Sequence, residues 1–144
     1  MKRTVVDASV ILKWYLLDET HGVKALALLQ QCTARELEIL APSLLTYELM
    51  NGLVIAARSA RLDQDTVSLS FSGFMNLGIR LYDISFFADK MLQYCRLYGR
   101  SVYDSSYLAL AEREGVDLIT ADERLFNSVQ RDLSWVRWIG SLTL

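Results

Sequence analysis

The sequence predicts an α/β fold, in which a mostly parallel β-sheet is covered by helices on both faces. Short apolar segments of the kind that form buried strands alternate with longer segments whose apolar residues recur at helical spacing. The 144 residues are 52% hydrophobic and 22% charged, with a single proline and no repeated or low-complexity segment. Together these observations predict one compact domain spanning residues 1–144.

The expected strands are short and rich in β-branched and other apolar residues. They cover residues 4–6, 38–41, 80–84 and 117–120, with an edge strand at 136–139. The first of them, Thr4-Val5-Val6, ends at Asp7. It therefore delivers a carboxylate to the turn that follows the strand.

The expected helices connect these strands. They cover residues 9–15, 23–34, 43–59, 63–77, 85–98, 103–114 and 122–129. Ser9 and Ser85 have side chains that cap helix N-termini, and Pro42-Ser43 precedes the long third helix. Gly99 and Gly115 follow two helices at the position where glycine commonly ends them.

Composition narrows the class of protein. The net charge of −2 and the pI near 5.4 argue against a basic surface that binds nucleic acid regardless of sequence. Cys32 and Cys95 are isolated in the sequence, which favours buried thiols in a reducing compartment. No signal peptide and no apolar run near the ~20 residues of a membrane span occurs, so we expect a cytoplasmic protein that does not bind membranes.

Four acidic residues lie beside apolar sequence, and two of them follow strands of the predicted parallel sheet. Asp7 ends the first strand, and Asp122 lies two residues past Thr120 at the end of the fourth. Asp104 opens the helix that leads into the fourth strand, and Glu48 lies on the long third helix. Ligands bind outside the carboxyl ends of such strands. We therefore expect the four carboxylates to share one site.

Each of the four residues also has a purely structural interpretation. Asp7 and Asp122 could cap the helices that follow them, and Asp104 could favour the positive end of its helix dipole. Glu48 is harder to explain in this way, because the leucines around it place it against the apolar side of its helix and a lone buried carboxylate costs several kcal/mol. The functional interpretation depends on the joint placement of all four.

Carboxylates that are brought together repel one another unless a cation lies among them. Oxygen ligands without Cys or His favour Mg²⁺ or Mn²⁺ over zinc. Such ions promote phosphoryl chemistry by activating water, orienting the phosphate and stabilising the leaving oxygen. A metal would also allow an acidic pocket to hold a phosphate.

Other catalytic arrangements are absent from the sequence. His21 is the single histidine, so two histidines cannot perform acid–base catalysis without a metal. Gly73 and Gly78 have the spacing of a phosphate-binding loop, but Ile79-Arg80 stand where Lys followed by Ser or Thr is required. No Gly-x-Ser-x-Gly nucleophile segment occurs.

With these residues in view, the chain resembles the PIN-domain nucleases and, among them, the VapC-type toxins of prokaryotic toxin–antitoxin pairs. The similarity spans nearly the whole chain in four segments in the family's order. These are residues 5–10 with Lys13-Trp14, residues 42–51 around Glu48, residues 101–111 around Asp104, and residues 118–125 around Asp122. Ser105 stands where a small residue such as alanine is expected, and residues 61–89 match nothing specific.

The resemblance implies a three-layer sandwich around a central, mostly parallel sheet of about five strands. It assigns metal binding and catalysis to four carboxylates, namely Asp7, Glu48, Asp104 and Asp122. It assigns a supporting role to the hydroxyls of Thr120 and Ser9. It further implies one or two Mg²⁺ or Mn²⁺ ions, RNA as substrate, a homodimer, and a small antitoxin that inserts into the active-site groove of a toxin–antitoxin hetero-oligomer.

The mechanism that follows is hydrolysis of an RNA phosphodiester bond, in which water activated by the carboxylates and their metal attacks the scissile phosphate in line. Lys13 is the cation that we expect to guide the RNA backbone. Other candidates for that role are Arg58, Arg61, Arg100 and Arg124.

Two other classes of protein remain open. A magnesium-binding phosphatase-like or receiver-like α/β domain would also carry an aspartate at the end of the first strand, although Asp7-x-Ser9 lacks the second aspartate of the phosphatase motif. A catalytically idle PIN-like module would use its apolar surface only to hold a partner helix. The mean hydropathy of +0.20 is compatible with such an interface.

Overall fold

The computed structural model describes all residues 1–144 and contains one sheet of five parallel strands. The strands lie in the order β3-β2-β1-β4-β5 and are β1 (Lys2–Val6), β2 (Leu37–Pro42), β3 (Arg80–Tyr82), β4 (Leu118–Thr120) and β5 (Val136–Trp138). This confirms the predicted parallel sheet, with β5 at one edge. β1 begins two residues earlier than expected, because Lys2 and Arg3 already pair with β2.

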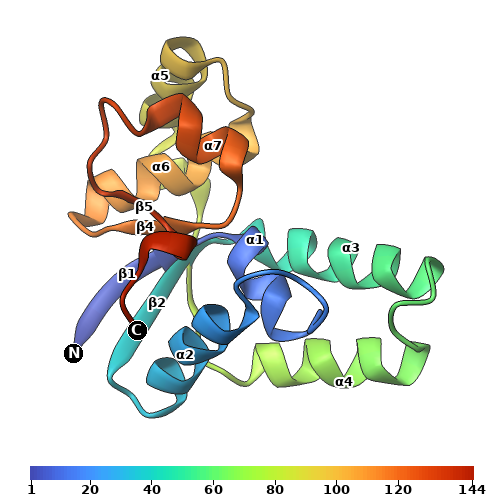
Figure 1. Cartoon of the computed structure of the whole chain (residues 1–144). Coiled ribbons are helices and arrows are strands. Elements are labelled where there is room, and N and C mark those ends of the chain that lie inside the picture. The colour runs from blue at the N-terminus through green and yellow to red at the C-terminus, as the bar shows by residue number, and fades with distance from the viewer.

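Seven α-helices connect the strands (Figure 1). They are α1 (Ala8–Ile11), α2 (Gly22–Thr33), α3 (Leu45–Arg58), α4 (Gln64–Met75), α5 (Ala88–Tyr98), α6 (Val102–Glu114) and α7 (Glu123–Val129). Three short 3-10 helices supplement them: η1 (Leu12–Trp14), η2 (Ile84–Phe86) and η3 (Ile139–Ser141). Gly99 and Gly115 end α5 and α6 in the left-handed conformation, as expected.

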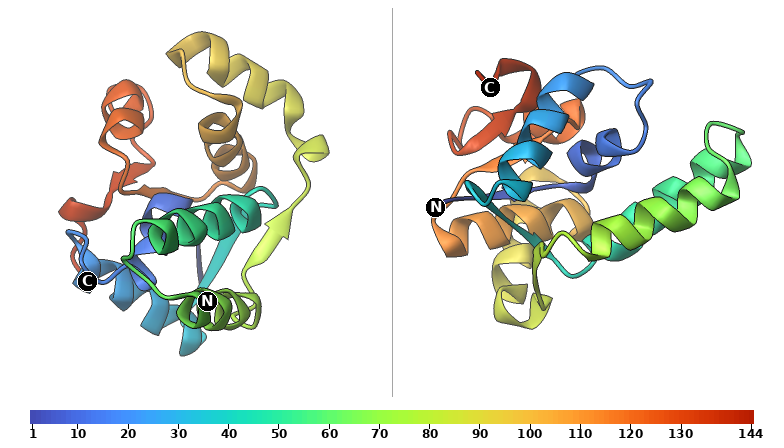
Figure 2. Two further views of the ribbon diagram at one scale, coloured as in Figure 1. Left: turned by 90° about the vertical axis from the view of Figure 1, so that its right-hand side faces the viewer. Right: turned by 90° about the horizontal axis from the view of Figure 1, so that it is seen from below.

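Helices cover the two faces of the sheet, as predicted. α6 packs on β1, β2 and β4 on one face with α5 outside it, and α1 and α2 lie on the other (Figure 2). Residues 105–111 of α6 are all buried because the helix lies between the sheet and α5. One hydrophobic core of 30 buried residues joins these layers.

The pair α3–α4 departs from the compact layers. The two helices run antiparallel and extend away from the sheet (Figures 1 and 2). The first turn of α3 nevertheless stays in the core, since Leu45 and Leu49 are completely buried. The inner face of α3 is packed along its length, since Leu53 and Ala56 are buried as well, while Ile55 and Arg58 of the projecting hairpin are exposed.

Three expected helix starts are wrong. The N-cap of α1 is Asp7 rather than Ser9, and the N-cap of η2 is Asp83 rather than Ser85. In both cases the aspartate two residues earlier accepts the serine backbone N–H and so forms the cap itself. The third helix begins at Leu45 because Pro42 still belongs to β2, where it pairs with Tyr82.

The strand order places a topological switch point at the centre of the sheet. From β1 the chain moves outward to β2 and β3, and then returns to the other side of β1 to form β4 and β5. The connections that leave the carboxyl ends of β1 and β4 therefore run to opposite sides of the sheet, and ligands bind at such a point. Asp7 and Asp122 follow these two strands.

No helix of the chain has the length and apolar character required to cross a bilayer.

Candidate active site

Asp7 follows β1 directly and is only 5% exposed. Its Oδ1 accepts hydrogen bonds from the backbone N–H of Ser9, at 3.1 Å, and from the Ser9 hydroxyl. Its Oδ2 accepts a hydrogen bond from the Thr120 hydroxyl, at 2.5 Å. The Ser9 hydroxyl also accepts the backbone N–H of Ala121, at 2.9 Å. Two hydroxyls thus hold the Asp7 carboxylate between β1 and β4.

The pKa of Asp7 is raised to about 7. Burial is the largest cause, because it disfavours the charged form, and the hydrogen bonds from Ser9 and Thr120 oppose it. The charges of Asp122 and Glu48 raise this pKa further. Three of the four predicted ligands therefore lie close enough to repel one another.

Glu48 lies in the first turn of α3, where its Oε1 accepts a hydrogen bond from the Tyr107 hydroxyl at 2.6 Å. Burial raises the pKa of Glu48, the bond from Tyr107 lowers it, and the charge of Asp104 raises it. Tyr107 itself is 2% exposed, and burial together with Glu48 raises its pKa well above its ordinary value. The backbone N–H of Ala8 acts on the same phenol oxygen. Tyr107 therefore connects α6 to both α3 and the start of α1.

Asp104 lies in the first turn of α6 and forms an ion pair with Arg100. The guanidinium donates to Asp104 Oδ2 through Nη2 at 2.8 Å and through Nε at 3.2 Å. Both side chains are about one quarter exposed. Arg100 thus partly neutralises a carboxylate that faces Glu48.

Asp122 caps α7, as its structural interpretation predicts. Its Oδ1 accepts the backbone N–H groups of Arg124 and Leu125, at 3.0 and 3.2 Å. Its own backbone N–H donates to the Thr120 hydroxyl, at 3.0 Å. Thr120 therefore holds the backbone of Asp122 and the side chain of Asp7 together.

The carboxylate oxygens of the four predicted ligands are the kind of ligand that a hard divalent cation prefers. In the observed side-chain conformations no three Asp, Glu, His or Cys side chains converge on a single point that could hold a metal. Beyond Asp7, however, each carboxylate keeps one oxygen without a protein hydrogen bond, namely Glu48 Oε2, Asp104 Oδ1 and Asp122 Oδ2. A cation among them would also relieve the repulsion that raises the pKa values of Asp7 and Glu48.

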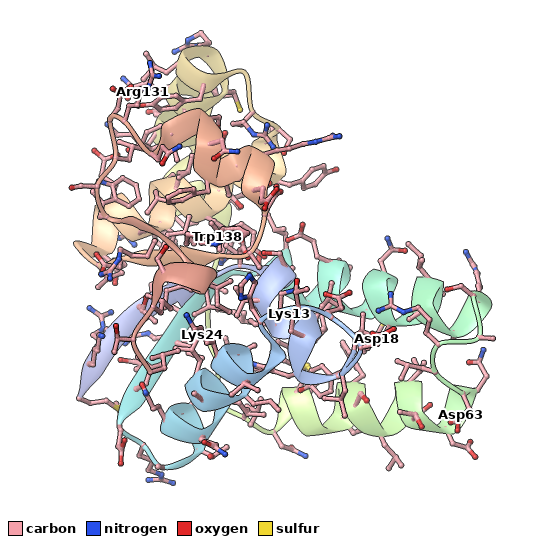
Figure 3. The ribbon with its side chains drawn as sticks, viewed as in Figure 1. Lys13, Asp18, Lys24, Asp63, Arg131 and Trp138 are labelled. Carbon is pink, nitrogen blue, oxygen red and sulfur yellow. The ribbon has the colours of Figure 1, made fainter.

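Lys13, the predicted guide for the RNA backbone, is buried and paired, and its role stays a prediction. It is 7% exposed and its ammonium group contacts Glu19 at 3.2 Å, beside the loop that carries Asp18 (Figure 3). Arg61 contacts Asp18 and Glu19 in the same network. Arg58 and Arg124 are exposed and take part in no ion pair.

Two contacts at the site were not foreseen from the sequence. The position of Tyr107 near Asp104 could have been inferred from its spacing, since a residue three positions after Asp104 lies on nearly the same side of a helix. The pairing of Arg100 with Asp104 could have been inferred from their spacing of four residues. Nothing local indicates that Tyr107 reaches Glu48, 59 residues away.

Sequence and fold comparisons agree with this description. The PIN domain family model matches residues 4–132. Ribonuclease VapC3 of Pyrobaculum aerophilum is 30% identical over 125 residues, which are 85% of this chain and 92% of that protein.

Three solved structures are similar to the chain. PAE2754 from Pyrobaculum aerophilum has a TM-score of 0.69 at 25% identity and covers 97% of this chain and 85% of its own. VapC20 of Mycobacterium tuberculosis, a toxin that cleaves the sarcin–ricin loop, has a TM-score of 0.64 at 11% identity, with coverages of 88% and 95%. FitAcB from Neisseria gonorrhoeae has a TM-score of 0.53 at 18% identity, with coverages of 96% and 99%. The last two show the fold alone. This chain belongs to the PIN domain family, and its relatives include VapC ribonucleases.

Proposed function

We propose that this chain is a Mg²⁺- or Mn²⁺-dependent endoribonuclease that hydrolyses RNA phosphodiester bonds and acts in the cytoplasm as the toxin of a VapBC-type toxin–antitoxin pair. One observation carries the proposal: Asp7 is buried at the switch point of the sheet, and its burial, together with the charges of Asp122 and Glu48, raises its pKa to about 7. Such an arrangement opposes folding of the metal-free chain, and a cation relieves it. The similarity to Ribonuclease VapC3 supports RNA as the substrate.

Four carboxylates would hold the cation, namely Asp7, Glu48, Asp104 and Asp122. When bound, a divalent cation supplies activation of water and neutralises charge on the phosphate. Ser9 and Thr120 hold both Asp7 oxygens, and Thr120 also fixes the backbone of Asp122. Tyr107 holds Glu48 through Oε1 and leaves Glu48 Oε2 without a protein hydrogen bond.

The chain offers no alternative acid–base pair at this position. His21 directly precedes α2 without a capping hydrogen bond from its side chain, and its ring packs edge-on with that of Trp138, with 5.8 Å between ring centroids. It has no partner among the four carboxylates, and it is the single histidine of the chain. Carboxylates with a divalent cation are therefore the chemistry that these residues support best.

The metal requirement is tested with purified protein and an end-labelled single-stranded RNA. We expect cleavage with Mg²⁺ or Mn²⁺, loss of cleavage in excess EDTA, and recovery when Mn²⁺ exceeds the chelator. A DNA strand of the same sequence serves as the matched control and is expected to remain intact. Cleavage at an unchanged rate in excess EDTA would contradict the proposal.

The toxin assignment includes two partners: a second copy of the chain in a homodimer, and a small antitoxin that inserts into the active-site groove. The VapC name of the curated relative supports this assignment. Induced expression is expected to arrest growth, and removal of both Glu48 and Asp104 is expected to abolish the arrest. If growth arrest persists without these carboxylates, the chain acts as a catalytically idle binding module instead.

A further inference from the structure

We propose that Arg100 is an internal counterion of the carboxylate site: it occupies Asp104 in the metal-free chain, and a divalent cation has to displace it in order to bind there. The ion pair between the two residues then sets the concentration of Mg²⁺ or Mn²⁺ at which the site fills. This inference rests on the proposed metal-dependent function and concerns the regulation of that same site.

Arg100 is the one basic residue of the chain that forms an ion pair with any of the four predicted ligands. Its Nη2 and Nε atoms both donate to Asp104 Oδ2. Both side chains are more buried than those of the surface pair Arg137–Asp117, which are nearly half exposed. A partly buried pair with two charge-assisted hydrogen bonds is stronger than an exposed pair, so Arg100 is a serious competitor for Asp104.

The stability of α6 does not explain an arginine at this position. Arg100 lies in the connection 99–101 and directly precedes Ser101, the N-cap of α6. The first turn of a helix carries a partial positive charge, which favours the carboxylate of Asp104 and disfavours a guanidinium. The backbone N–H of Asp104 already donates to the Ser101 hydroxyl, at 3.0 Å. Arg100 therefore acts on the side-chain charge of Asp104 and not on the helix.

The carboxylates of the site have no other paired cation in the chain. Burial raises the pKa of Glu48, and the charge of Asp104 raises it further. Arg100 offsets part of this repulsion by neutralising Asp104. A divalent cation among the carboxylates would neutralise the same charge, so the arginine and the cation compete.

The free oxygen of Asp104 does not remove this competition. Asp104 Oδ1 accepts no hydrogen bond from Arg100, whose two bonds both go to Oδ2. The two oxygens are bonded to the same carbon, so a cation on Oδ1 would lie next to the guanidinium and be repelled by it. Gly99 and Ser101 are exposed, which leaves the Arg100 side chain free to turn towards solvent. Displacement of Arg100 relieves the repulsion.

The test measures Mn²⁺ binding by the loss of the electron paramagnetic resonance signal of free Mn²⁺, which does not require cleavage. Arg100→Gln is expected to bind Mn²⁺ about 10-fold more tightly than wild type, because two ligands that exclude each other lower each other's affinity. Arg100→Lys keeps the charge but loses the planar fork that donates twice, and is expected to fall between the two.

Arg137→Gln is the matched control. It also removes one positive charge and one ion pair, with Asp117 at 3.3 Å, but Asp117 precedes β4 and lies at the opposite end of that strand from Asp122. Its Mn²⁺ affinity is expected to stay within about 2-fold of wild type, because exposed ion pairs contribute little.

Thermal unfolding gives a second readout. In excess EDTA, Arg100→Gln is expected to melt below wild type, because Asp104 loses its counterion. In saturating Mn²⁺ this difference is expected to shrink, since the cation then neutralises Asp104 in both proteins. A difference that Mn²⁺ leaves unchanged would show a purely structural role of Arg100 and would overturn the proposal.

Asp104→Asn tests whether the effect passes through Asp104. In that background Arg100→Gln is expected to change Mn²⁺ affinity by less than about 2-fold, because the arginine no longer has a carboxylate to neutralise. A 10-fold gain that persists there would contradict the proposal. So would Mn²⁺ binding that is unchanged or weaker in Arg100→Gln alone, because the arginine would then orient Asp104 for the cation and not compete with it.

Failure of the proposed function gives a different result. A wild-type protein that shows these differences in Mn²⁺ binding but cleaves no RNA would retain the counterion and lose the nuclease assignment. If wild type and Arg100→Gln both cleave RNA and require the same Mn²⁺ concentration, the nuclease assignment is retained and the counterion is lost.

Discussion

Asp7 and Asp63 occupy the same local position in two different regions of the molecule. Each caps a helix from an extended backbone, with φ and ψ of −87° and 172° for Asp7 and of −88° and 166° for Asp63. Each accepts a backbone N–H through Oδ1, at 3.1 and 2.7 Å. Asp7 lies at the centre of the sheet, whereas Asp63 lies at the far end of the projecting α3–α4 hairpin (Figure 3).

Their pKa values move in opposite directions. The backbone N–H of Thr66 lowers the pKa of exposed Asp63, while burial and two carboxylates raise that of Asp7 to about 7. The same backbone arrangement therefore stabilises the charge of Asp63, and the surroundings of Asp7 oppose its charge. A capping role therefore does not exclude a role in ligand binding, and only the tertiary surroundings distinguish these two aspartates.

The largest expected effect is on catalysis. Asp7→Asn is expected to lower RNA cleavage by at least about 1,000-fold, because charge stabilisation by a bound divalent cation is worth several kcal/mol. Asp63→Asn is the matched control, because Asn can still accept the capping hydrogen bond at a position far from the site, and it is expected to cleave at the wild-type rate. Rates of single-turnover cleavage in Mn²⁺ compare the two. Equal rates in both variants would remove Asp7 from the site.

The pH dependence of stability is expected to separate the same two residues. Asp7 holds its proton up to about pH 7 in the folded chain but only to its ordinary pKa of 3.8 when unfolded. The stability that its protonation provides is therefore fully present below pH 3.8 and is lost as the pH rises through 7. Urea unfolding of the metal-free protein is expected to find Asp7→Asn more stable than wild type above pH 7, by about 2 kcal/mol.

The contribution of Asp63 to the pH dependence of stability is expected to have the opposite sign. Its pKa is lowered, so the stability that its charge provides is present above 3.8 and is lost as the pH falls through the folded-state pKa. Asp63→Asn is therefore expected to be less stable than wild type at neutral pH. A stability difference for Asp7→Asn that does not vary between pH 5 and pH 8 would contradict the account of its burial.

A smaller effect is expected from Tyr107→Phe, which removes the hydrogen bond to Glu48. Loss of this bond frees the Glu48 side chain, so we expect Mn²⁺ to bind about 10-fold more weakly, as measured by the rise in melting temperature with Mn²⁺. Tyr82→Phe removes an equivalent bond, from the Tyr82 hydroxyl to Glu114 at 3.1 Å, away from the site. It is expected to leave the response to Mn²⁺ unchanged. An equal loss in both variants would show a general loss of stability.

The smallest expected effect is that of Asp63→Ala, which removes a cap without touching the site. We expect a small loss of stability, because the capping hydrogen bond is removed, and no change in RNA cleavage. Urea unfolding at pH 7 and the single-strand cleavage assay measure the two quantities. A fall in cleavage would show that the α3–α4 hairpin takes part in the reaction.

Much of the fold could be predicted because its pattern is local. Runs such as Val5-Val6 and Leu118-Ile119 are apolar on both faces and so identify buried parallel strands. The caps at Ser9 and Ser85 could not be predicted correctly, because serine and the aspartate two residues earlier offer the same kind of acceptor to the backbone. Which of them takes the bond depends on where the preceding strand ends.

The sequence by itself determined the order of strands and helices and the placement of Asp7 and Asp122 at strand ends, since these follow from periodicity and from the geometry of parallel sheets. Only the tertiary structure decided which polar groups meet. Thr120 reaches Asp7 across 113 residues of chain, and Tyr107 reaches Glu48 across 59. Burial and long-range distances set the pKa of Asp7, and no local pattern contains them, because they arise when distant segments pack together.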